Sequence, residues 1–370
     1  GKFDRFRFTW SDLFIVCAVQ CTIITAYWNY DLRTTLSDSF SFTLNFAALV
    51  VLARIHLGTL SGVRTFLLGV VVASVVMAPL ALWEWRMSPQ LHTTTYGYFQ
   101  HVFQQHARGS FFRPILFFSH ALALGRFFAF AAFLALLPMR RDLVQWLGPV
   151  GRLVFVAPLG GLVLSMSWGP MLLFLLLCAG YFVVERMPKL SLALPATALT
   201  LILIHFAGTP IFVIAQNAVA QVAPDRAASL QYRVDALDEY SSVILARPFF
   251  GFGTQGDGRI QGRATDSQAL ISLLRAGFIG TFFYFGWYVL ALWSAIGVAE
   301  RTRGTVFFRR ALGACLVGGL GLAVTVIDAG LDLWMILTLA PMVSLYAWLK
   351  DQPPRLAPAP PRFVPARSTS

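Results

Sequence analysis

Long apolar stretches separated by short polar connections dominate the chain. A helix that crosses a membrane needs about 20 mostly apolar residues, and ten stretches come close to or exceed this length. They cover approximately residues 11–30, 38–56, 64–85, 112–138, 147–166, 168–185, 190–216, 267–298, 310–328 and 332–349. Only two connections are long, residues 86–111 and 217–265. The pattern predicts an all-α fold, a polytopic transmembrane helix bundle of about ten helices.

The composition supports a membrane protein and excludes an ordinary soluble one. Hydrophobic residues make up 57% of the chain, charged residues only 12%, and the mean hydropathy is +0.67. Soluble domains carry about 25% charged residues. The net charge of +12 is spread along the chain, so we expect a lipid bilayer as partner and no nucleic acid.

The distribution of basic residues predicts the orientation, because cytoplasmic loops of membrane proteins are enriched in Lys and Arg. With a cytoplasmic N-terminus, 18 of the 29 basic residues fall on the cytoplasmic side. We therefore expect both termini in the cytoplasm and an external loop at 217–265. Residues 1–352 would form the transmembrane domain, and residues 353–370 a disordered, Pro-rich cytoplasmic tail. The chain has no initiator Met and is expected to begin downstream of its natural start.

The long external loop contains a short segment with helical spacing of its apolar side chains. We expect an amphipathic helix there, lying against the membrane surface. The residues with helical spacing are Arg233, Ala236, Leu237, Tyr240 and Ile244.

This helix should end at residues 247–248, because a residue that precedes proline avoids the α-helical region. Gly251 and Gly253 then permit a tight backbone turn.

The helix after the loop begins near Asp266 and carries a polar stripe. Gln268, Ser272 and Arg275 are spaced four and three residues apart, so they share one helix face, and that face is not expected to meet lipid. Asp266 has two interpretations. It could cap the helix by accepting hydrogen bonds from free backbone N–H groups, or it could do chemistry at the membrane boundary.

These residues resemble the O-antigen ligase and polysaccharide polymerase superfamily of bacterial inner membranes. The shared pattern is a basic residue, an amphipathic stretch, a Pro- and Gly-containing turn, a polar helix start and a Gly-hydrophobic-hydrophobic-Gly segment. Two upstream segments, 109–115 (GSFFRPI) and 164–169 (LSMSWG), are also similar to family motifs. The main pattern is matched by Arg233, by PFFGFG at 248–253, by Asp266 and Ser267, and by GFIG at 277–280.

Three departures from the family pattern refine the resemblance. Ligases typically have His-Asn where this chain has Asp266 and Ser267, and many polymerase-type members have Asp there. In the upstream turn, Trp168 replaces the family's Arg. Ligases also tend to have about two more helices before the loop, which agrees with an N-terminally shortened chain. The first departure favours a polymerase over a ligase.

The resemblance implies a glycosyltransferase that joins undecaprenyl-diphosphate-linked oligosaccharides at the external face of the bacterial inner membrane. It implies no metal and no cofactor, and it makes other components of polysaccharide export candidate partners. Direct inverting displacement is the expected reaction, since no Ser-His-Asp or Cys-His arrangement is evident. The alternative within the family is a ligase that transfers the glycan to a lipid or protein.

Cationic side chains and one carboxylate are the candidate site residues. Guanidinium groups bind a diphosphate well because they donate two parallel hydrogen bonds. Arg233 and Asp266 are the candidate catalytic residues, with Asp266 as the base. Two alternatives without a catalytic role stay open. Arg247 could only anchor the Gly-containing turn, and the Arg113 side chain could only reach the lipid headgroups. The diphosphate-binding candidates are Arg233, Arg247, Arg275 and Arg113, and the loop motif is Pro248, Gly251 and Gly253.

Two rival functions lie outside the enzyme class. A transporter or lipid flippase would carry charged residues at mid-membrane in several helices, whereas here charge concentrates near one external surface. A structural subunit without activity is the second rival. The histidines of the 86–111 connection, His92, His101 and His106, have no recognised metal-ligand spacing. They are expected to lie in a solvated loop.

Overall fold

The computed structural model describes residues 7–99, 106–206, 213–214, 217, 220–221, 231, 235–236, 239–253, 267–325 and 332–352. Helices make up nearly all of this part of the chain, and its only strands are two residues long. The fold is all-α, as the apolar pattern predicts. The predicted tail, 353–370, and most of the predicted external loop lie outside the described residues.

The N-terminal half contains two long hydrophobic hairpins and a small β-ribbon. The ribbon is antiparallel and places Ala107 opposite Phe112. The elements are α1 (Trp10–Asn29), α2 (Leu32–Phe42), the π-helix η2 (Thr43–Ala48), α3 (Leu49–Leu57), α4 (Leu60–Met87), α5 (Leu91–Tyr96), β1 (Ala107–Arg108), β2 (Phe111–Phe112) and α6 (Ala121–Leu136).

The second half begins with short helices and ends with three long ones. The elements are α7 (Arg140–Leu147), the 3-10 helix η4 (Gly148–Arg152), α8 (Val156–Leu164), α9 (Trp168–Arg186), the 3-10 helix η5 (Pro188–Leu192), α10 (Ala193–Phe206), α13 (Gln268–Arg301), α14 (Val306–Val324) and α15 (Asp332–Lys350).

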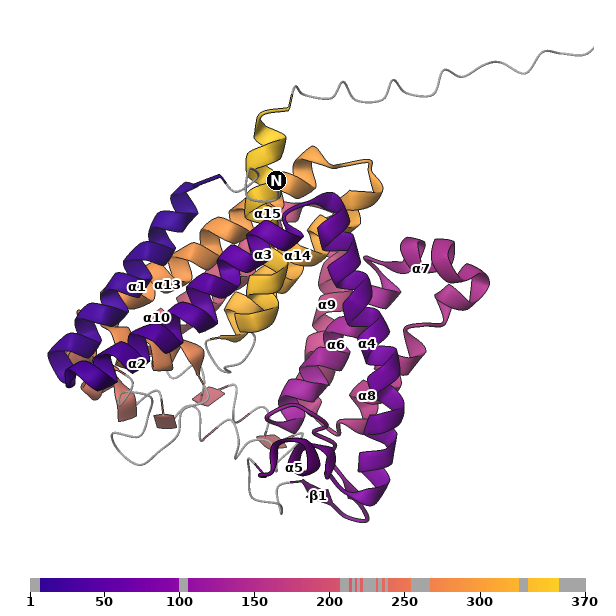
Figure 1. The fold of residues 1–370 in the computed structure, drawn as a ribbon, viewed down its shortest axis with the longest axis horizontal. Coiled ribbons are helices and arrows are strands. Elements are labelled where there is room, and N and C mark those ends of the chain that lie inside the picture. The colour runs from indigo at the N-terminus through magenta and orange to yellow at the C-terminus, as the bar shows by residue number, and fades with distance from the viewer. Residues whose placement is uncertain are drawn as a thin grey trace, which may run out of the picture.

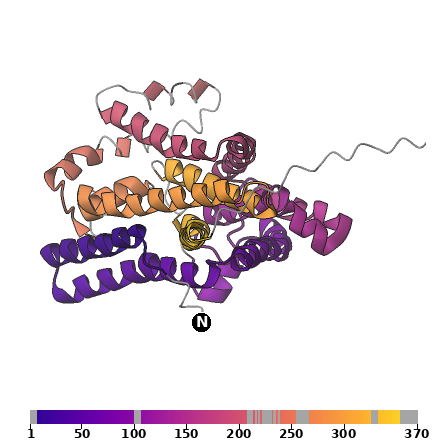
Figure 2. The ribbon, with the colours of Figure 1, turned by 90° about the horizontal axis from the view of Figure 1, so that it is seen from above.

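The helices form two groups joined by α14 and α15. One group packs α1 on α13 and the α2–α3 segment on α1 and α15, and the other packs α4, α6, α8 and α9 together (Figure 1). Helix α14 contacts α13 in the first group and α9 in the second, and it also packs on α15. Seen from above, α13 and α14 lie between the α1–α3 layer and α10 (Figure 2).

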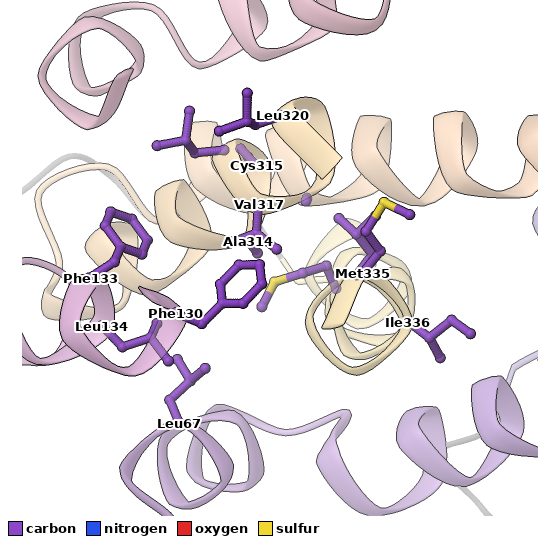
Figure 3. Close-up of a cluster of buried hydrophobic side chains, with 14 of the residues drawn as sticks. Leu67, Phe130, Phe133, Leu134, Ala314, Cys315, Val317, Leu320, Met335 and Ile336 are labelled. Atoms are coloured by element: carbon purple, nitrogen blue, oxygen red, sulfur yellow. The ribbon is translucent and has the colours of Figure 1, made fainter. Parts of the chain in front are cut away.

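The hydrophobic core lies where the two groups meet. Figure 3 shows this contact, with side chains of α4, α6, α14 and α15 directed toward one another. Phe130 of α6 lies 5.4 Å from Trp334 of α15, measured between ring centroids. Small residues on α14 allow close approach, since a β-carbon at Gly318 would be only 2.8 Å from Leu339. Close backbone approach at small residues is typical of helix packing in membranes.

Seven helices of the described chain are long and apolar enough to cross a membrane. They are Trp10–Asn29, Leu32–Leu57, Leu60–Met87, Trp168–Arg186, Gln268–Arg301, Val306–Val324 and Leu333–Lys350. An eighth candidate joins Ala121–Leu136 to Arg140–Arg152 across a bend of 73°. The chain is therefore a multi-pass membrane protein.

Two of the ten predicted stretches contain shorter helices than expected. In 112–138, α6 begins only after His120, whose ring accepts a hydrogen bond from the Leu122 N–H at 3.0 Å. In 147–166, Gly148 has φ +61° and a 3-10 turn precedes α8. In 190–216, α10 begins at Ala193, directly after η5, and the described part of it reaches Phe206. Caps and a positive-φ glycine, rather than polarity, set the first two boundaries.

The beginning of α1 and the end of α15 lie at the same end of the bundle. Arg7 forms a salt bridge with Asp351 there. At the opposite end of α1, the Thr25 hydroxyl donates to the Phe250 carbonyl oxygen at 2.7 Å. The end that holds Arg7 and Asp351 is rich in basic side chains, which bind carboxylates or backbone carbonyl groups of neighbouring segments. They include Arg54 beside Asp12, Lys189 beside Glu300, Arg301 beside the Leu349 carbonyl and Arg303 beside the Arg186 carbonyl.

Candidate functional site

The Pro- and Gly-containing turn packs onto a break in α13. Gly277 has φ +61° and ψ −167°, which interrupts the helix. The N–H groups of Phe278 and Ile279 donate instead to the turn, to the carbonyl oxygens of Pro248 at 2.7 Å and Phe249 at 3.3 Å. A buried amide needs a partner, and the turn supplies it. Backbone hydrogen bonds therefore join the last part of the predicted external loop to α13.

Both glycines of the turn adopt the left-handed conformation that the sequence predicts. Gly251 has φ +64° and Gly253 has φ +72°. A β-carbon on Gly251 would lie 2.6 Å from the Leu274 carbonyl oxygen, and that oxygen accepts a hydrogen bond from the Phe252 N–H at 2.7 Å. The tight turn is confirmed, and its second role is close contact with α13.

Helix α1 holds the other side of the turn. The Tyr30 hydroxyl donates to the Phe252 carbonyl oxygen at 2.7 Å. The rings of Trp28 and Phe250 meet edge to face, with 4.8 Å between their centroids. The turn is thus fixed between α1 and α13.

Arg247 takes part in this anchoring. Its guanidinium group donates to the Asn29 side-chain oxygen and lies 4.9 Å from the centroid of the Phe252 ring. These are the contacts that the anchoring alternative for this arginine requires. Arg247 does not line the cavity described below.

The amphipathic segment before the turn packs on protein. Residues 239–246 are helical, and the described residues of the predicted apolar face, Ala236, Tyr240 and Ile244, are buried. They cluster with Leu270 and Leu274 of α13. The predicted helical spacing is confirmed for these residues, and their apolar face meets α13; the position against the membrane surface stays a prediction.

A cavity of about 620 Å³ lies beside the turn, enclosed mainly by α1, α2, η2 and α13. Gln268, Ser272 and Arg275 all line it, so the predicted polar stripe faces protein-enclosed space. The other lining residues are Ala18, Thr22, Thr25, Ala26, Asp38, Ser41, Phe42, Leu44, Asn45, Phe46, Leu49, Gly253, Ile271, Ala276, Gly280, Thr281, Tyr284, Leu333 and Ile336.

The cavity changes character along its length. Near the turn, its charged lining residues are Arg275 and Asp38. One and two helical turns further along α13 and the α2–η2 segment, the lining is mostly apolar and includes Phe46 and Tyr284, whose ring centroids are 4.9 Å apart. The Thr281 hydroxyl, also in the lining, has no hydrogen-bond partner within the described chain. The lining therefore combines one cationic and one anionic side chain with a mostly apolar remainder.

The α2–η2 contribution is absent from the sequence-based prediction. Asp38, Ser41 and Asn45 are spaced three and four residues apart, which places them on one helix face. This spacing could have indicated a polar helix face, but the stretch 38–56 was interpreted only as a membrane-spanning helix. A π-helix carries the last of the three, and π-helical turns occur frequently at functional sites.

The N-cap of α13 is Ser267, whose hydroxyl accepts a hydrogen bond from the Leu270 N–H at 3.2 Å. The capping role that was one interpretation of Asp266 thus belongs to the next residue. Asp266 and Arg233 themselves lie outside the described residues.

Arg113 lies in the other helix group and does not line the cavity. Its side chain is buried and donates to the Ser167 hydroxyl at 2.6 Å and to the Ser165 carbonyl oxygen at 3.5 Å. The two upstream segments with family-like motifs, 109–115 and 164–169, therefore meet through this arginine. The burial excludes the alternative in which Arg113 reaches the lipid headgroups.

Asp31, between α1 and α2, is the N-cap of α2. Hydrogen bonds from Thr34, including its backbone N–H at 3.0 Å, lower the pKa of the Asp31 carboxyl group. This carboxylate fixes the start of the helix that brings Asp38 to the cavity.

No protein-family model, curated protein or solved structure matches the chain.

Proposed function

We propose that the chain is a polysaccharide polymerase-type glycosyltransferase of the bacterial inner membrane that joins undecaprenyl-diphosphate-linked oligosaccharides at the external face. The observation that carries the proposal is the cavity beside the Pro248–Gly253 turn. It combines Arg275 at one end with a mostly apolar lining further in, and a polyprenyl diphosphate has a matching anionic head and apolar chain.

The proposed reaction is a single displacement. The acceptor hydroxyl attacks the anomeric carbon of the donor, the bond from that carbon to the diphosphate oxygen breaks, and the diphosphate leaves with the electron pair. Asp266 accepts the hydroxyl proton. Arg275, together with Arg233, stabilises the negative charge that grows on the leaving diphosphate. Arg247 supports the site indirectly, by anchoring the turn.

The orientation in the proposal follows from charge. The end of the bundle that holds Arg7, Lys350 and the basic segments between them is the cytoplasmic end under the positive-inside rule. The cavity mouth, with Gly253 and Arg275, then belongs to the external half of the membrane. The donor would enter from the outer leaflet.

The test is reconstitution of the purified protein with an undecaprenyl-diphosphate-linked oligosaccharide, followed by gel analysis of the product. A ladder of lengthened glycans supports the polymerase. Transfer to an added lipid or protein acceptor without a ladder supports the ligase instead. A donor that crosses liposome membranes without any glycosidic bond being formed supports a transporter, and the enzyme proposal then fails.

Arg275→Gln, compared with Arg303→Gln, tests the site itself. Removing one donor that stabilises a developing charge typically lowers kcat by about 100- to 1,000-fold, so we expect a loss of this size for Arg275→Gln. Arg303 lies at the opposite, basic end, exposed and hydrogen-bonded only to the Arg186 carbonyl oxygen among the described residues. Arg303→Gln should keep wild-type turnover. Wild-type turnover in Arg275→Gln would remove this arginine from the proposed site.

A further inference from the structure

A second hollow lies far from the turn, beside α7 and η4. It has a volume of about 520 Å³. Two of its lining residues are Val144 and Gln145, and the other four are Arg140, Arg141, Arg152 and Arg309. Four guanidinium groups from α7, η4 and α14 therefore face one space.

The four arginines are not neutralised by nearby carboxylates. Within the described part of the chain, none of them forms a salt bridge. Of the neighbouring acids, Asp142 is already engaged, since Arg310 donates to its oxygens at 2.6 and 2.7 Å and Arg64 lies 2.9 Å away. Glu185 lies near Arg141 and Arg309 around Tyr181 but forms no salt bridge with them in the described part of the chain. Clustered cations raise the local electrostatic potential, so the fold keeps this positive charge available for an external anion.

The position of the hollow points to a membrane anion. Arg64 is near the start of α4 and Arg310 near the start of α14, so their shared Asp142 places α7 at the basic end of the bundle. Figures 1 and 2 show α7 and η4 extending sideways from the helix bundle. A segment in this position lies at the level of the lipid headgroups when the bundle spans a bilayer.

Apolar side chains on the same segment are exposed. Trp146, Val150 and Leu153 are each more than half exposed. An exposed tryptophan at such a position is typical of the membrane interface. Arginines beside exposed apolar residues give two kinds of contact, one for a headgroup phosphate and one for the adjoining acyl chains.

We propose that the hollow formed by Arg140, Arg141, Arg152 and Arg309 binds the phosphate headgroup of an acidic phospholipid. The apolar side chains of η4 and its flanks lie in the adjoining lipid. The site fixes α7 on the membrane surface, and it is independent of glycosyl transfer at the other cavity.

The test measures binding of phosphatidylglycerol and phosphatidylcholine to the full-length chain in detergent, by native mass spectrometry. We expect phosphatidylglycerol to bind more tightly than phosphatidylcholine. A basic residue near an anionic surface is worth roughly a fivefold change in affinity. The double variant Arg141→Gln/Arg152→Gln should therefore lose phosphatidylglycerol affinity by roughly 25-fold. Both side chains are exposed, and an unchanged unfolding midpoint in lipid-free detergent will verify the fold.

Arg186→Gln/Arg303→Gln is the matched control, since it removes two exposed arginines at the same end of the bundle. The control should keep the wild-type preference for phosphatidylglycerol. An equal loss in both double variants, or no loss in either, overturns the proposal. A third arm adds inorganic phosphate at millimolar concentration. If it displaces phosphatidylglycerol, the site takes free phosphate and the lipid assignment is wrong.

Discussion

The carbonyl group of Phe249 lies against Gly277, in the place that a β-carbon on residue 277 would occupy. The contact joins the turn at 248–253 to the break in α13, and the Phe278 and Ile279 amides complete it with hydrogen bonds to the turn. Two features therefore require glycine at the break: the positive φ of residue 277 and the close approach of the turn.

Gly277→Ala should destabilise the protein strongly. The φ of +61° with ψ of −167° is a conformation that only glycine adopts without strain, and such strain costs about 1–3 kcal/mol before the clash with Phe249 is added. Thermal unfolding of the purified protein will measure the loss. Gly69→Ala is the control, because a β-carbon there meets nothing within 4 Å and alanine favours a helix by about 1 kcal/mol. An unchanged midpoint in Gly277→Ala would contradict the observed break.

Tyr30→Phe should loosen the turn. The variant removes the hydrogen bond from the Tyr30 hydroxyl to the Phe252 carbonyl oxygen, which is worth about 0.5–1.5 kcal/mol. Tyr27→Phe is the matched control on the same helix, since Tyr27 is 69% exposed. Unfolding midpoints, together with protease cleavage near residue 250, will compare the two. Equal behaviour of both variants would remove Tyr30 from the anchoring contacts.

Asp12→Ala should cost far more stability than Asp351→Ala. Asp12 pairs with Arg54, and both side chains are almost fully buried. Removing one partner of a buried pair costs about 3–5 kcal/mol because the other charge is left uncompensated. Asp351 pairs with Arg7 at the surface, and an exposed pair is worth about 0–1 kcal/mol.

The double variant Asp12→Ala/Arg54→Met separates charge burial from lost packing. It should recover much of the stability that Asp12→Ala loses, as measured by thermal unfolding, since no unpaired charge remains. A double variant as unstable as Asp12→Ala alone would show that Asp12 acts mainly through its cap contact with the Thr9 N–H at 2.6 Å.

The stabilising effect of Asp31 should depend on pH. The hydrogen bonds from Thr34 hold its pKa below the ordinary value, which is about 3.9 for aspartate. A lowered pKa means that the charged form stabilises the fold above the ordinary value, and that this contribution is lost as the pH falls through the lowered pKa. The unfolding midpoint of wild type should exceed that of Asp31→Asn at pH 6, and the difference should shrink with acidification. Since asparagine also caps a helix, a constant difference would contradict the contribution of the Asp31 charge.

Local patterns in the sequence predict the local features of the structure. The apolar stretches predict the long helices, because burial in a membrane depends on composition over about 20 residues. The glycines at 251 and 253 predict a turn, and the spacing of Gln268, Ser272 and Arg275 predicts a shared face. Each of these features depends on neighbours within a few residues, and each is found.

Features that depend on distant residues do not follow from such patterns. The helix break at Gly277 needs the turn as a hydrogen-bond partner. The segment GFIG by itself does not predict a break. The contact between Arg113 and Ser167 and the approach of Asp38 to α13 likewise depend on packing. Helical spacing indicates which side chains share a face, but only the packed bundle determines what that face meets.

The exchange of hydrogen bonds between the turn and α13 restricts how the cavity can widen. Swinging the turn outward would strip the Phe278 and Ile279 amides of their acceptors in apolar surroundings, at a cost of several kcal/mol for each group in lipid. The opposite wall, α2 with its π-helical extension, meets α13 through side chains, with Phe46 packed against Tyr284 and Trp287. The turn is therefore the part of the cavity wall that backbone hydrogen bonds hold in place.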